Sequence, residues 1–228
     1  MCNKINITPK LTIEGEDRTL GAVLLGAPYS RKRESVMLPM IQQDIQSKPM
    51  MGVAVFDTDG IPTQAAARCA RESGRPYVLL DPRMEWCPFF NPLIGDENEV
   101  FEDLRTVVSE YLPDLSPSLR ALNESLLSNA IKVLKRLDKA EGVNGRYATF
   151  INMNTVLQNP SQDGRKLVIR FGQLKGETDA EQKENSDIAS WFINEYYAER
   201  SKPFEQTACL RLLLGKLISE PHLRTVLN

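Results

Sequence analysis

The chain has 228 residues, and its content of 42% hydrophobic and 25% charged residues is ordinary for a globular protein with a sizeable core. Lys and Arg number 28 against 30 Asp and Glu, so the formal net charge of -2 excludes a global positive field that would steer a polyanion to the surface. No apolar run approaches the roughly 20 residues of a membrane-spanning helix, and the start Met1-Cys2-Asn3-Lys4 lacks the apolar stretch of a signal peptide, so we expect a cytoplasmic protein.

The first elements have the patterns of a hairpin, a strand and a helix. Polar and apolar residues alternate over 4–14, which predicts a hairpin or an edge strand. Residues 22–25, Ala-Val-Leu-Leu, form the continuous apolar run of a buried parallel strand, and Gly26 ends it. After a polar loop, apolar residues recur at helical spacing over about 34–46. Pro39 lies close enough to the start of this predicted helix to be tolerated, and we expect it to bend the helix.

A second strand, a second helix and a third strand follow. Residues 52–57, Gly-Val-Ala-Val-Phe-Asp, predict a buried strand, and the Ala-rich stretch 62–72 predicts a helix with Pro62 in its first turn. Gly74 is placed to end that helix in a left-handed conformation. Residues 77–80, Tyr-Val-Leu-Leu, predict the third strand. Strands that alternate with helices in this way indicate βαβ units, so the first part is predicted to be an α/β domain with a parallel sheet.

From about Asp96 the pattern becomes helical. Amphipathic stripes indicate packed helices over residues 100–111, 119–137, 188–196 and 210–218. Between these stripes, residues 167–171 have a pattern that fits a strand or a helix, and the charged stretch 176–186 predicts an exposed loop. The sequence therefore predicts an α/β domain over 1–95 and an all-α domain over 96–228.

One loop carries a recognisable chemical motif. A phosphate-binding P-loop has the pattern G-x-x-x-x-G-K-[ST], follows a strand and opens a helix. The loop 26–33, Gly-Ala-Pro-Tyr-Ser-Arg-Lys-Arg, has Gly26 and Lys32 at the required positions. Arg31 replaces the second glycine, and Arg33 replaces the Ser or Thr whose hydroxyl binds Mg²⁺. A guanidinium can contact phosphate but cannot coordinate a cation, so taken alone the loop is better interpreted as a solvated basic loop than as a phosphate site.

Cysteine and histidine predict no second site. Cys2, Cys69, Cys87 and Cys209 lie far apart without a CxxC pair, and His222 is the single histidine. This spacing predicts reduced, mostly buried thiols and no zinc site.

The order of several short motifs resembles the TraG-like coupling proteins, the DNA-pumping ATPases of conjugation and type IV secretion. The run 26–39 is similar to the family's nucleotide loop and following helix. Residues 56–60, Phe-Asp-Thr-Asp-Gly, are similar to the strand that ends in D-x-K-G, with Asp59 in place of its lysine. Further similarities lie in the strand 78–82, the N-P-L turn 90–93 and the helical stretch 213–227.

This resemblance implies a partial RecA-like P-loop sheet followed by an all-helical domain, with six copies in a ring on the cytoplasmic face of the inner membrane. It implies DNA or a relaxase–DNA complex as substrate, and secretion-system proteins as partners. The nucleotide-binding candidates of the degenerate Walker A loop are Gly26, Ser30, Arg31, Lys32 and Arg33. The near-site candidates are Asp57, Gly60 and Asn91. No apolar strand ending in Asp-Glu supplies the Walker B acids, so no catalytic residue and no metal ligand are assigned, and binding of ATP and Mg²⁺ is expected to be weak or lost.

Two functions fit these patterns. The first is a coupling-protein-like motor domain that binds nucleotide weakly through Lys32. The second is a catalytically inactive relative that serves as a docking or assembly module for transfer substrates. Local DNA binding through Arg18, Arg31, Lys32 and Arg33 is a third reading, and a solvated loop is favoured over it because no aromatic residues are interleaved.

Overall fold

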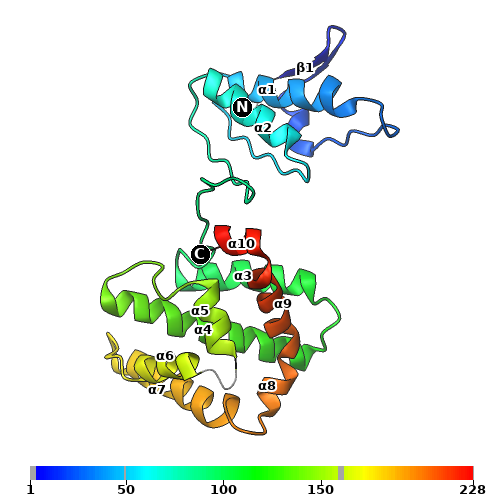
Figure 1. Ribbon diagram of the computed structural model, residues 1–228. Coiled ribbons are helices and arrows are strands. Elements are labelled where there is room, and N and C mark those ends of the chain that lie inside the picture. Colours follow the sequence, from blue (N-terminus) through cyan, green and yellow to red (C-terminus); the bar gives the residue numbers. More distant parts are fainter. Residues whose placement is uncertain (1–3, 49, 159–161, 228) are drawn as a thin grey trace. The chain divides into compact units, whose positions relative to one another are not determined.

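The structure is a computed structural model that describes residues 4–48, 50–158 and 162–227. It is mostly helical, at 59%, and it divides into two compact units, Met1–Asp81 and Pro82–Asn228 (Figure 1). Each unit is described by itself below.

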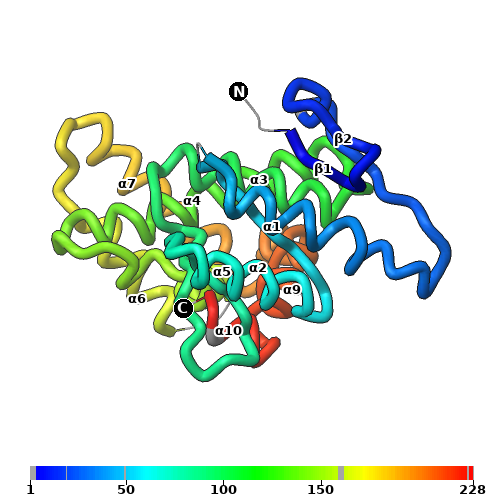
Figure 2. Tube along the Cα trace, turned by 90° about the horizontal axis from the view of Figure 1, so that it is seen from above, coloured from blue at the N-terminus to red at the C-terminus, as the bar shows by residue number. Residues whose placement is uncertain are grey.

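The first unit contains a hairpin and two main helices. Strands β1 (Ile5–Thr8) and β2 (Leu11–Ile13) pair antiparallel, so the hairpin expected over 4–14 is confirmed. A 3₁₀ turn η1 (Asp17–Leu20) follows, and a π-helical turn η2 (Arg33–Met37) leads into α1 (Leu38–Gln46). Helix α2 (Ile61–Glu72) packs beside α1, as Figures 1 and 2 show.

Helices α1 and α2 share a small core. Ile45 of α1 packs with Cys69 and Ala70 of α2. Pro62 lies in the first turn of α2, where its missing N–H is not needed, and Gly74 has a left-handed φ of +64° after the last turn. Both positions agree with the prediction, because each depends on local backbone chemistry alone.

The predicted parallel sheet is wrong. In the described residues the only sheet is the β1–β2 hairpin, and residues 22–25, 53–56 and 77–80 are coil. Most of their side chains face water: the exposed fraction is 84% for Val23, 95% for Phe56 and 77% for Val78. An apolar run shows that a segment can occupy a buried strand, but the strand forms only where neighbouring strands accept its hydrogen bonds and cover its side chains. The partial RecA-like α/β fold is therefore corrected to a helical unit with a hairpin.

The second unit consists of helices. They are α3 (Glu97–Tyr111), α4 (Pro117–Glu141), α5 (Phe150–Leu157), α6 (Gln162–Gly172), α7 (Asp179–Trp191), the π-helical turn η3 (Phe192–Tyr196), α8 (Lys202–Gln206), α9 (Ala208–Ser219) and α10 (Pro221–Val226). Capping side chains fix where several of them begin: Asp96 accepts from Asn98 N, and Ser116 accepts from Leu119 N. None of the described helices is long and apolar enough to cross a bilayer.

Helix α4 is the centre of the second unit. Its residues Leu126, Leu127 and Leu134 are at most 1% exposed, because α3, α5 and α6 pack around it. The helices predicted over 100–111, 119–137 and 210–218 are confirmed as α3, α4 and α9. The ambiguous stretch 167–171 lies in α6, whereas the loop predicted over 176–186 is wrong from Asp179 onward, where α7 begins.

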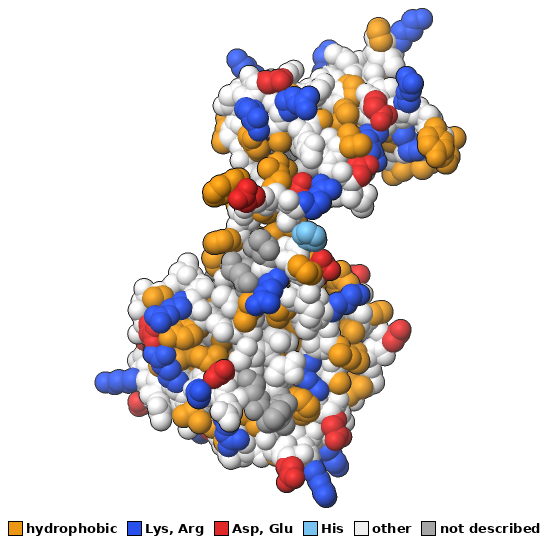
Figure 3. Space-filling view, in the orientation of Figure 1, with side chains coloured by type: hydrophobic (Ala, Val, Ile, Leu, Met, Phe, Trp, Pro, Cys, Tyr) orange, Lys and Arg blue, Asp and Glu red, His pale blue; other side chains and the backbone are white. Residues whose placement is uncertain are grey.

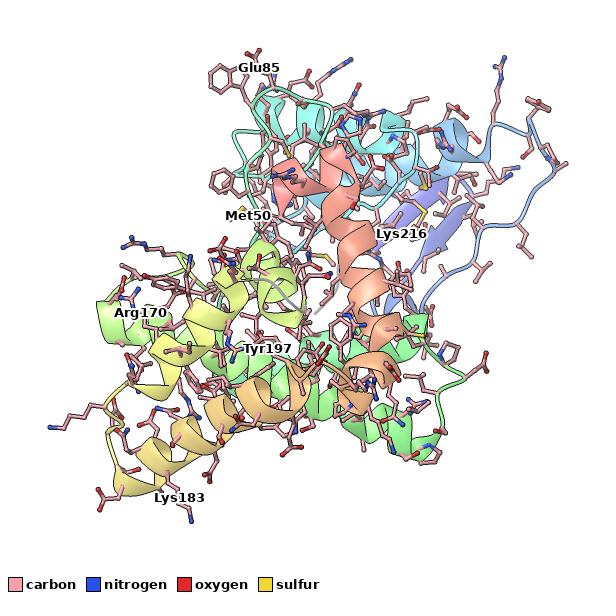
Figure 4. All side chains as sticks on the ribbon, turned by 60° about the horizontal axis from the view of Figure 1, so that its bottom comes forward. Met50, Glu85, Arg170, Lys183, Tyr197 and Lys216 are labelled. Carbon is pink, nitrogen blue, oxygen red and sulfur yellow. The ribbon has the colours of Figure 1, made fainter. Side chains whose placement is uncertain are left out.

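Aromatic side chains complete this core. Phe192 and Tyr196 are fully buried, and their rings meet edge to face with centroids 5.5 Å apart. Tyr197 lies inside the unit (Figure 4), where its hydroxyl donates to Val156 O, and burial raises the pKa of Tyr197 above its usual value. The second unit thus has the densely packed interior of a stable domain.

Residues 82–95, assigned to the first domain from the sequence, contact the helical unit. Asn91 Nδ2 donates to Ala148 O over 2.7 Å, and Leu93 is 1% exposed within the helical core. Phe90 N donates to Val226 O over 2.7 Å. These contacts explain why the compact units divide between Asp81 and Pro82.

Candidate functional site: the loop 26–33

The loop 26–33 curls before it enters the helical turn η2. Tyr29 and Arg31 have left-handed φ values of +64° and +55°, whereas Lys32 is right-handed. Ser30 N donates to Ala27 O over 3.2 Å, which closes the curve. Left-handed and right-handed residues in succession turn backbone N–H groups toward one concave side, a geometry that suits anions.

Lys32 lies inside this curve. Its Nζ donates to Gly26 O over 2.9 Å and to Ala27 O over 3.3 Å. A Cβ on Gly26 would lie 2.8 Å from Ser30 Oγ and 3.4 Å from Lys32 Cδ, so a larger residue here would have to displace these two side chains. The ammonium is held by carbonyls of its own loop, and a phosphate would have to replace those two hydrogen bonds to bind Lys32.

Arg33 is joined to Asp59. Arg33 Nη1 donates to Asp59 Oδ2 over 2.5 Å, with both side chains partly exposed. The hydrogen bond to Asp59 raises the pKa of Arg33, while the N–H of Ile61 and then Arg33 lower the pKa of Asp59. Arg33 replaces the Mg²⁺-binding hydroxyl and Asp59 replaces a lysine, so the two departures from the resembled motif neutralise each other.

Asp57 and Gly60 form the start of α2. The carboxylate of Asp57 accepts hydrogen bonds from the N–H groups of Gly60 and Thr63 and from the Thr63 hydroxyl. These donors, with the Thr63 hydroxyl first, hold the pKa of Asp57 below its usual value. Gly60 caps the helix with φ at +82°, in the left-handed region. Both residues therefore have a structural role beside the loop.

Asn91, the remaining near-site candidate, belongs to the helical unit. Its Oδ1 accepts from Leu93 N over 3.0 Å, and its Nδ2 donates to Ala148 O. Both ends of the amide are used to fix the N-P-L turn. The structure thus brings Asp59 to the loop and gives Asn91 a packing role.

The basic residues considered for DNA binding have other partners. Arg18 Nη2 donates to Asp44 Oδ2 over 2.6 Å, and both side chains are about 15% exposed. Lys32 and Arg33 are held as described above, which leaves Arg31 as the exposed cation of the set. Within the described residues, no group of three or more His, Cys, Asp or Glu side chains could hold a metal ion. Cys2 lies outside the described residues. Cys69, Cys87 and Cys209 are free thiols, of which Cys69 is buried, Cys87 half-buried and Cys209 exposed, so the prediction of mostly buried thiols is wrong for the described cysteines.

The first unit has a second feature that the motif search missed. Among its described residues, the buried apolar ones are Ile5, Ile45, Pro62, Ala67, Cys69 and Ala70. Many apolar side chains lie instead on its surface, and on the face that Figure 3 shows they are interspersed with charged side chains. The large exposed ones are Leu11, Leu20, Val23, Leu24, Leu25, Tyr29, Met50, Val53, Phe56, Ile61, Tyr77, Val78 and Leu80. The signal was present in the sequence as apolar runs, which we interpreted as the interior of a sheet.

Comparisons with known proteins add no identification: no family model matches the chain, and no significant match is found among curated proteins or solved structures.

Proposed function

We propose that this chain is an assembly module whose first unit obtains a full hydrophobic core only together with a protein partner. The observation that carries this proposal is the exposure of residues 22–25, 53–56 and 77–80, called the three apolar segments below. Soluble monomers rarely leave so much contiguous apolar chain in water, and such surfaces mark binding sites.

The energy available for binding is substantial. Burial of a large apolar side chain contributes about 1.5–3 kcal/mol, so covering the eight exposed large side chains of the three apolar segments would release on the order of 10 kcal/mol. Part of this energy is offset by the ordering of coil on binding. What remains is enough for a specific complex with a dissociation constant in the micromolar range or below.

The resemblance to coupling proteins supplies the setting. The partners we propose are the proteins of a conjugation or type IV secretion apparatus at the cytoplasmic face of the membrane: a relaxase–DNA complex, a secreted protein, or a full-length coupling protein. The Arg33–Asp59 pair supports assembly over ATP hydrolysis by this loop, because the guanidinium that replaces the Mg²⁺-binding hydroxyl cannot coordinate a cation and it also holds the carboxylate of Asp59.

A binding titration tests the proposal. The chain is titrated against the purified relaxase and coupling protein encoded beside it, with Val78→Asp as the test variant. Leu212→Asp is the matched control, since Leu212 is similarly exposed, at 72%, on α9 of the helical unit. We expect binding that Val78→Asp weakens at least tenfold and that the control leaves unchanged. If the chain binds none of these proteins, the proposed function is refuted.

A second candidate function is phosphate binding by the loop 26–33. The concave loop and the position of Lys32 favour it. Calorimetric titration with ATP, with and without Mg²⁺, is the test, and Lys32→Ala is the control. We expect weak, Mg²⁺-independent binding that Lys32→Ala abolishes, because the Mg²⁺ ligand is replaced by Arg33. Absence of heat at millimolar ATP would dismiss this function.

A further inference from the structure

We infer that one partner of the first unit is a second copy of this chain, joined by self-pairing of residues 22–25 as β-strands. This inference rests on the proposed function and names its partner. It is carried by three observations on this segment: its free backbone, its lack of charge, and the apolar area exposed with it.

The backbone of residues 22–25 is available for pairing. In the part of the chain that the structure describes, these residues make no backbone hydrogen bond. Their composition, Ala-Val-Leu-Leu, has no Pro and no charged residue, the features by which proteins protect strand edges from one another. Gly21 and Gly26 flank the segment and give its ends the freedom to become extended. The segment therefore has what strand pairing requires and nothing that prevents it.

The absence of charge favours an identical partner. From residue 19 to residue 30 the sequence contains no charged residue, so two copies aligned about a two-fold axis bring no like charges together. The other two segments differ, since residues 53–56 are followed by Asp57 and residues 77–80 by Asp81. Strands paired about a two-fold axis run antiparallel, so self-pairing of either would be limited to a few residues by the carboxylate that directly follows it. Of the three apolar segments, 22–25 is thus the one suited to a symmetric contact.

The exposed apolar area is close to that of a standard dimer interface. Within the uncharged stretch 19–30, the exposed fractions run from 43% for Leu24 to 86% for Leu25, with Leu20 and Val23 at 84% and Tyr29 fully exposed. With about 150–200 Å² for each large apolar side chain, these five expose on the order of 700 Å² per chain. A standard interface buries about 800 Å² on each partner. In the dimer, strand pairing of 22–25 would satisfy the backbone, and these side chains would supply the apolar cover.

Sedimentation velocity of the full chain from about 1 to 100 µM tests the inference. We expect a monomer–dimer equilibrium with a dissociation constant in the micromolar range. Val23→Lys, at a side chain that is 84% exposed, should weaken it at least tenfold, whereas Leu212→Lys on α9 should leave it unchanged. Circular dichroism of both variants checks that the helices are kept.

Hydrogen exchange of the unmutated chain gives a reading that needs no variant. The amides of residues 22–25 should become protected as the concentration rises through the dissociation constant. A chain that is monomeric at every concentration, or a dimer insensitive to Val23→Lys and without this protection, overturns the inference. A monomer that still binds a transfer protein overturns it while leaving the proposed function standing.

Discussion

Replacement of Asp138 by Ala is the change whose cost the structure defines best. Asp138 lies near the end of α4 and is 5% exposed. Its carboxylate accepts from the N–H groups of Gly145 and Tyr147, each over 2.7 Å, and from Ala148 over 3.3 Å. One side chain thus folds the loop between α4 and α5 onto the helical core.

The expected loss of stability follows from these three hydrogen bonds. A hydrogen bond to a charged group contributes about 1.5–3 kcal/mol, and bonds that share one acceptor are not additive, so we expect Asp138→Ala to lower the free energy of unfolding by about 3–5 kcal/mol. Asp138→Asn keeps an acceptor oxygen and should lose roughly half as much. Urea unfolding followed by circular dichroism measures both variants. A loss below about 1 kcal/mol for Asp138→Ala would refute the role assigned to the carboxylate.

Three further predictions follow from single contacts. A Cβ at Gly172 would lie 2.7 Å from Ala189 Cβ, so Gly172→Ala should lower the melting temperature and Ala189→Gly should restore it in the double variant, as thermal unfolding would show. The pKa of Asp57 is lowered from 3.8, so the stabilisation of α2 by its carboxylate is complete above about pH 4 and is lost as the pH falls through the lower pKa of the folded state. Amide hydrogen exchange in α2 should become faster in that acidic range, and Asp57→Asn should remove this pH dependence. Tyr196 Oη donates to Leu157 O over 2.9 Å in the core, so Tyr196→Phe should cost about 1–2 kcal/mol in urea unfolding, and an unchanged midpoint would contradict this.

The helices could be predicted from the sequence because their signals are local. The stripe of α4 repeats at 3.6 residues, Ser116 caps its start, and Gly142 ends it in a left-handed conformation with φ at +63°. Pro62 and Gly74 mark α2 in the same way. Each of these signals acts within a few residues, so no knowledge of distant partners is needed.

The sheet and the details of the candidate site depend on distant residues and could not be predicted. An apolar run such as 22–25 is compatible with a buried strand, but its neighbours decide whether the strand forms. In the sequence, Arg33 and Asp59 are two separate differences from the resembled motif. The structure shows that they form a hydrogen bond although they are 26 positions apart. Likewise, the loop conformation that brings Lys32 Nζ to Gly26 O depends on the left-handed backbone of Tyr29 and Arg31. Tyr and Arg rarely adopt this conformation, so the sequence did not predict it.

The claim that the first unit is incomplete by itself is tested most directly by hydrogen exchange of the monomeric chain, diluted below any self-association. We predict that amides of residues 22–25, 53–56 and 77–80 exchange within seconds, while those in the centre of α4 remain protected with the stability of the helical unit. Addition of a binding partner should slow exchange in the three apolar segments. Strong protection of these segments in the isolated monomer would contradict the account, because it would mean that the unit already has a sheet of its own.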